Sequence, residues 1–246
     1  MKSDYEILAE DGLSLEDPRK RARLMQLLCC GALAMSPLNP AYARLFGGSA
    51  RRLEAGRSIY ELEGEVLVNG RRADINTRIR GGDTVRTGDT GRIVFAVGGD
   101  SFILRSGSEL EIGGADFFID SLRILAGRLL SVFAKRDSGR RLSMSASTAT
   151  IGIRGSGVYL EVEPELTYLC TCYGQVAVSA NDDPDDSELI VSKSHDEPRY
   201  IASQSQKGTR IRPAPVINHS NEELELLEAI VGRTTPPGFG SQSYDK

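Results

Sequence analysis

The chain has 246 residues, of which 40% are hydrophobic, and its 30 basic and 34 acidic residues give a formal net charge of −4. A chain of this length can bury a core without a metal ion or a disulfide to hold it together. The charge balance lacks the basic excess of a nucleic-acid-binding protein, so nucleic acid is not an expected partner.

The N-terminal region has the three parts of a secretory signal peptide. A basic cluster at residues 19–23 precedes an apolar stretch at residues 24–35, and the segment ends in Ala41-Tyr42-Ala43. The apolar stretch is shorter than the ~20 residues that span a bilayer. We therefore predict that residues 1–43 are a signal peptide, that residues 44–58 are a linker, and that the mature protein is periplasmic without a membrane span. The alternative is that the segment stays uncleaved as an anchor.

Short alternating runs separated by turns continue from residue 59 to residue 212. Asn69-Gly70, between residues 66–68 and 71–73, predicts a two-residue hairpin, because both turn positions need positive φ. A second hairpin is predicted at residues 98–100. Further strands are predicted over residues 109–112, 121–125, 127–133, 141–145, 158–162, 167–173 and 175–179. Residues 181–187, which are acidic, are predicted to form a solvated turn, and residues 188–212 to add edge strands.

This pattern predicts a mainly β fold for residues 59–212, because many short strands at close spacing are typical of all-β domains. The periodicity is compatible with a β-solenoid-like domain or with a β-sandwich.

Residues 213–232 are predicted to contain one C-terminal amphipathic helix. Ser220 and Glu223 have the spacing of a capping box, and Gly232 provides a stop signal. Apolar residues at helical spacing form one stripe: Leu224, Leu227, Ile230 and Val231. We expect this stripe to dock on the β-domain, with a partner-binding surface as the alternative, and we expect residues 233–246 to be a disordered tail.

Two glycine-containing segments resemble the FecR family. Residues 81–88, with the sequence GGDTVRTG, are similar to the strand entry G-D-x-V-x-T-G of that family, and residues 150–162 contain its R-G-T/S segment. The resemblance covers roughly residues 60–180 and implies a fold of stacked β-solenoid coils. It assigns structural roles to Gly82, Asp83, Thr87, Gly152, Arg154, Gly155 and Ser156, with a glycine turn whose arginine bonds to nearby carbonyls or carboxylates.

The resemblance also carries an expectation about function. The best-known FecR proteins are transmembrane anti-sigma regulators, whereas only 18 residues precede Arg19 in this chain. We therefore expect a stand-alone exported domain without a sigma-factor partner. It would be a non-enzymatic binding, signalling or scaffold module of the cell envelope, with an envelope protein or a glycan as its ligand. No catalytic motif such as H-E-x-x-H, G-x-S-x-G or a P-loop is present.

A pair of cysteines, Cys170 and Cys172, is the unusual local feature. In a regular strand they share a face with Cα atoms about 6.6 Å apart, twice the rise per residue. A relaxed disulfide needs Cβ atoms about 3.8 Å apart, so a mutual bond would require a bulge. Three states remain open: buried inert thiols, a strained or interchain disulfide, and a metal site. In the last case His195 and His219 would complete a Cys2His2 set for zinc or another transition metal, and the protein would be a metal- or redox-linked periplasmic sensor.

Overall fold

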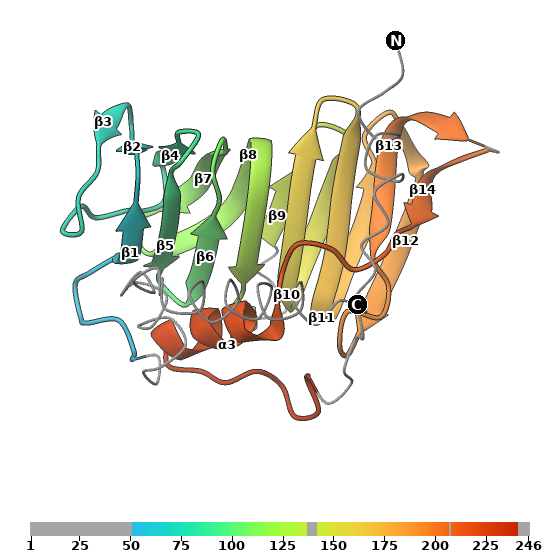
Figure 1. The fold of residues 1–246 in the computed structure, drawn as a ribbon. Coiled ribbons are helices and arrows are strands. Elements are labelled where there is room, and N and C mark those ends of the chain that lie inside the picture. The colour runs from blue at the N-terminus through green and yellow to red at the C-terminus, as the bar shows by residue number, and fades with distance from the viewer. Residues whose placement is uncertain (1–50, 137–141, 207, 241–246) are drawn as a thin grey trace, which may run out of the picture. The chain divides into compact units, whose positions relative to one another are not determined.

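The computed structural model describes residues 51–136, 142–206 and 208–240 (Figure 1). The predicted signal peptide lies outside these residues. Within the described ranges, no helix combines the length and the apolar character needed to cross a membrane.

The described residues are mainly β, as predicted, with one helix near the C-terminus. The elements are β1 (Ile59–Glu63), β2 (Val66–Val68), β3 (Arg71–Arg72), β4 (Thr84–Thr87), β5 (Arg92–Val97), β6 (Asp100–Leu104), β7 (Glu109–Ala115), β8 (Phe118–Val132), β9 (Leu142–Ser145), β10 (Ala149–Glu163), β11 (Leu166–Ala180), β12 (Asp183–Ser192), β13 (Arg199–Gln206), β14 (Thr209–Pro213) and α3 (Asn221–Ile230).

Both predicted hairpins are present. Val68 pairs with Arg71 across a turn in which Asn69 and Gly70 have φ values of 51° and 74°. The second hairpin joins β5 to β6 through Gly98, with a φ of 61°. These turns formed as predicted because each contains residues that tolerate positive φ, Asn69 and Gly70 in the first and Gly98 in the second.

Three strands of 15 residues, β8, β10 and β11, each contribute to two layers. The first part of β8 pairs with β7, whereas its second part pairs with β6 and β10. Each long strand contains a glycine with positive φ where its partners change: Gly127, Gly155 and Gly174, with φ values of 93°, 91° and 92°. Glycine is required there because a Cβ atom disfavours this conformation.

The bends fold the sheet into two layers around one hydrophobic core, as in a sandwich. One layer contains β1, β5, β6, β13 and β14, and the other contains β2, β3, β4, β7, β9 and β12. All the pairings are antiparallel except that between β8 and β9. This differs from the parallel stacking of solenoid coils, because hairpins connect many of the neighbouring strands.

The motif residues in the first glycine-containing segment, residues 81–88, hold the chain locally in place. Gly82 has a φ of 94°. The carboxylate of Asp83 accepts a hydrogen bond of 2.7 Å from the side-chain amide of Asn69. The hydroxyl of Thr87 donates to the carbonyl of Arg105 at 2.5 Å.

The second segment forms one continuous strand, β10, and not a turn followed by a strand. Gly152 pairs within the sheet, and the chain bends at Gly155. The hydroxyl of Ser156 is buried and donates to the carbonyl of Gln175 at 3.0 Å. The bonds expected for Arg154 are not found. Its side chain is exposed, and within the described ranges it makes no hydrogen bond or ion pair.

Helix α3 covers the outer face of the layer that contains β6 (Figure 1). The predicted capping box is present, with Ser220 accepting from the backbone of Glu223 and the Glu223 carboxylate accepting from the backbone of Ser220. Leu224 and Leu227 are fully buried. The carbonyl of Leu227 accepts a hydrogen bond of 2.7 Å from the hydroxyl of Ser101. The apolar stripe therefore docks on the β-domain, as expected.

Candidate metal site

The two cysteines lie on β11 at a bulge. Val158 pairs with Thr171, but the preceding residue Gly157 pairs with Tyr173, so Cys172 is the extra residue of β11. A bulge removes one residue from the regular alternation of the strand. Leu169 belongs to the core between the layers, whereas Cys170 and Cys172 are buried outside that core. Both thiols therefore lie on the outer side of the layer, and both are free.

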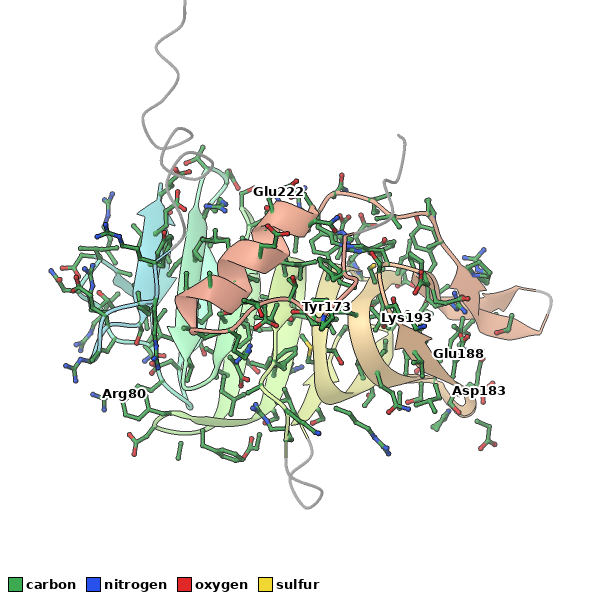
Figure 2. All side chains as sticks on the ribbon, turned by 90° about the horizontal axis from the view of Figure 1, so that it is seen from below. Arg80, Tyr173, Asp183, Glu188, Lys193 and Glu222 are labelled. Atoms are coloured by element: carbon green, nitrogen blue, oxygen red, sulfur yellow. The ribbon has the colours of Figure 1, made fainter. Side chains whose placement is uncertain are left out.

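The loop after β12 places His195 against this bulge. The backbone N–H of His195 donates to the carbonyl of Cys172 at 2.9 Å. His195 has a φ of 54°, a conformation that is uncommon for residues other than glycine. The loop is held by Asp196, whose carboxylate accepts from the backbone N–H of Lys193 at 2.7 Å. In Figure 2 the loop at Lys193 lies beside the strand that carries Tyr173.

The segment between β14 and α3 supplies His219. This residue immediately precedes the helix cap Ser220, so the start of α3 fixes its place in the chain. Its ring stacks on Tyr159, with ring centroids 4.5 Å apart and an interplanar angle of 22°. Tyr159 is the cross-strand partner of Cys170. The stacking therefore holds the His219 ring over the cysteine pair.

The structure brings all four predicted ligand residues together. The ligand atoms of Cys170, Cys172, His195 and His219 lie within 4.8 Å of one another. Cys170 Sγ is 3.5 Å from His195 Nδ1, which in turn is 2.9 Å from His219 Nε2. Zinc bond lengths imply tetrahedron edges of about 3.3 Å between nitrogens, about 3.6 Å between nitrogen and sulfur, and about 3.8 Å between sulfurs. Adjustments of about 1 Å or less would complete a tetrahedral site.

Each histidine has one ring nitrogen that faces away from the other histidine and bonds to an oxygen acceptor. These bonds leave the two nitrogens that face each other without a hydrogen. His195 Nε2 is 3.0 Å from the side-chain oxygen of Asn221, and His219 Nδ1 is 2.6 Å from the carbonyl oxygen of Ile217. Both oxygens can only accept, so both of these nitrogens carry the hydrogen. In neutral rings, the lone pairs of His195 Nδ1 and His219 Nε2 then face each other. A cation between them, a metal ion or a proton, would make this arrangement favourable.

The two thiols differ in their electrostatic environment. The hydrogen bond from Cys172 lowers the pKa of Cys170 well below its usual value, and His195 and His219 act in the same direction against the effect of burial. Burial raises the pKa of Cys172. A cation in the site would favour the thiolate form of both cysteines, because metal ligation deprotonates a thiol.

Aromatic rings close the site from solvent. Cys170 and Cys172 have no exposed surface, and His195 is 3% exposed. The ring of Phe239 lies 5.4 Å from His195 and 5.1 Å from Tyr173, measured between centroids. Residues 233–240 were predicted to belong to a disordered tail, but Phe239 packs as part of this wall. Among the described residues, the arrangement offers four protein ligands.

Sequence reasoning found the four candidate ligands but missed the residues around them. Asn221, Tyr159 and Phe239 carry no motif, and their roles follow from the contacts between β10, the C-terminal segment and α3. The motif residues within residues 81–88 and 150–162 are not among the four clustered ligands.

No protein-family model and no curated protein matches this chain. Among solved structures, the chain is similar to crystal structures of a "putative anti-sigma factor" from Parabacteroides distasonis ATCC 8503, at 2.50 and 1.65 Å resolution. The TM-scores are 0.43 and 0.42, and the sequence identity is 13% in both cases. Each match covers 53% of this chain and 58% of the solved chain, so it spans little more than half the length of either.

Proposed function

We propose that this protein is a non-enzymatic β-domain that binds one transition-metal ion, zinc foremost, through Cys170, Cys172, His195 and His219. The observation that supports this best is the pair of histidine nitrogens 2.9 Å apart, each directed inward by an acceptor on its other nitrogen. Metal-ligating histidines characteristically have such a partner on the second ring nitrogen.

The ligand set favours zinc over harder cations. Two thiolates and two imidazoles in a tetrahedral arrangement are a common structural zinc set, whereas magnesium and calcium prefer oxygen ligands. Four protein ligands in a closed site are typical of a structural centre and not of a catalytic one. The ion would join three segments that are distant in sequence: strand β11, the loop after β12 and the segment before α3.

A zinc titration of the reduced full-length protein tests the proposal. We expect binding of about one equivalent and a higher melting temperature, because a ligand that binds only the folded state stabilises it by about 2.7 kcal/mol at a hundredfold excess over Kd. Cys172→Ser should lose the tight binding and the thermal shift. Thr171→Val is the matched control, because Thr171 is buried between the two cysteines, and it should keep both effects.

The same titration can also refute the metal site. A reduced wild-type protein that carries no metal after purification, and whose melting temperature is the same with and without added zinc, would refute the metal site. The cysteines would then be packing thiols, with Cys170 paired to a histidine that carries the shared proton.

We further propose that the domain is exported and acts in the cell envelope as a FecR-like binding or signalling module. The basic, apolar and A-x-A order of residues 19–43 and the motifs at residues 81–88 and 150–162 support this. Protein recovered from the periplasm should begin at or near Arg44. Recovery of only the full-length chain in the membrane fraction would instead identify the segment as an anchor.

A further inference from the structure

Asn221, the first residue of α3, makes a side-chain hydrogen bond to the outer nitrogen of His195. The two atoms, Asn221 Oδ1 and His195 Nε2, are 3.0 Å apart. An amide oxygen accepts only, so this bond selects the His195 tautomer that carries its hydrogen on Nε2. That tautomer leaves Nδ1, the nitrogen that faces Cys170 and His219, free of hydrogen.

The position of Asn221 is set by contacts that do not involve the four ligands. Ser220 caps the helix immediately before it, and Glu223 completes the capping box. Glu223 is in turn held by Arg105 of the β-domain, whose guanidinium lies 2.9 Å from the Glu223 carboxylate. The start of α3 is therefore anchored on the sheet, and it presents the Asn221 oxygen to His195.

We propose that Asn221 is the positioning residue of the metal site: it fixes the tautomer and the ring orientation of His195 without touching the metal. This inference rests on the proposed metal site. Without an acceptor at this position, His195 can adopt the tautomer in which Nδ1 carries the hydrogen, and that tautomer cannot ligate through Nδ1. Loss of an outer partner of this kind typically weakens metal binding about 10- to 100-fold.

The experiment compares zinc affinity, measured by competition with a chelator, in the wild type and in three variants. Asn221→Leu removes the acceptor and should bind zinc about 10- to 100-fold more weakly. Asn221→Asp restores an acceptor and should bind at least as tightly as the wild type. Glu222→Leu places the same side chain at the adjacent, exposed helix position and should leave the affinity within about threefold of the wild type, because the Glu222 side chain bonds to Ser220 and not to His195.

Substitution with cobalt gives a readout that a purely structural role of Asn221 would not change. The visible spectrum of the Co2+ form should change in Asn221→Leu, because the ring of one ligand is displaced, and should be preserved in Asn221→Asp and Glu222→Leu. Melting in the presence of chelator separates metal affinity from folding. If Asn221→Leu does not fold, Asn221→Ala provides the same loss of acceptor with less bulk.

The outcomes separate this inference from the proposed function. A wild type that binds no zinc refutes the metal site itself. A wild type that binds zinc, together with an Asn221→Leu or Asn221→Ala variant of equal affinity and unchanged cobalt spectrum, refutes the positioning role alone.

Discussion

At the scale of single residues, the bulge at Cys172 decides what the cysteine pair can do. A regular strand would separate the two Cα atoms by about 6.6 Å and keep both side chains in one row. The bulge instead frees the Cys172 carbonyl to bind the loop that carries His195. The sequence shows the composition of the Cys2His2 set, but neither the bulge nor the left-handed conformation of His195 has a local signature. The convergence of the four residues could therefore be only a hypothesis before the structure was known.

Thr171, between the two cysteines, provides a prediction about stability. Its hydroxyl is fully buried and has no hydrogen-bond partner within the described part of the chain. Thr171→Val removes this unsatisfied group and keeps the shape of the side chain, so we expect the free energy of unfolding to rise by about 1 kcal/mol. Urea denaturation of the reduced, metal-free protein measures this. A clear loss of stability would show that the hydroxyl does have a partner in solution.

At the scale of secondary-structure elements, the predictions from the sequence were correct where the backbone geometry depends on residues close together in the chain. The Asn69-Gly70 hairpin and the Ser220 capping box each depend on residues within a few positions, and both are present. The bends of the long strands were missed, because a change of pairing partners depends on residues far away in the sequence. Residues 183–187 were predicted in a turn but belong to β12, whose Asp183 and Ser187 pair with β11 on either side of a register shift. Pro184 lies within this shift, and proline is tolerated at such irregular positions of an edge strand.

Two glycines of the same strand, Gly152 and Gly155, test the bend in β10. Gly155 has a φ of 91°, and a Cβ atom there would lie 3.2 Å from the Cα of Lys135. We expect Gly155→Ala to lower the free energy of unfolding by about 1–3 kcal/mol, because the alanine is held in a strained conformation.

Gly152→Ala is the matched control for this bend. Gly152 does not have positive φ, and the nearest atom to an added Cβ is 3.8 Å away, so the substitution should be neutral or stabilising by about 0.5 kcal/mol. Equal effects of the two substitutions in urea denaturation would contradict the role assigned to Gly155.

At the scale of the whole described domain, the core of the β-sandwich and the candidate metal site lie in different places and stabilise different parts of the chain. The core between the layers is made mainly by strand residues, and none of the four candidate ligands belongs to it. The outer face of one layer is instead covered by α3 and the C-terminal segment, and the four candidate ligands lie at this second contact. A metal ion would therefore stabilise the attachment of the C-terminal part of the chain more than the sandwich itself.

The most direct test of this account is X-ray absorption spectroscopy of the zinc-loaded, reduced protein. We predict a first shell of two sulfur atoms at about 2.3 Å and two nitrogen atoms at about 2.0–2.1 Å, with no bound water. At a zinc excess that loads the weaker-binding Cys172→Ser, one sulfur should be lost from this shell. A wild-type shell made only of nitrogen and oxygen would contradict the account, because it would place the zinc elsewhere on the protein.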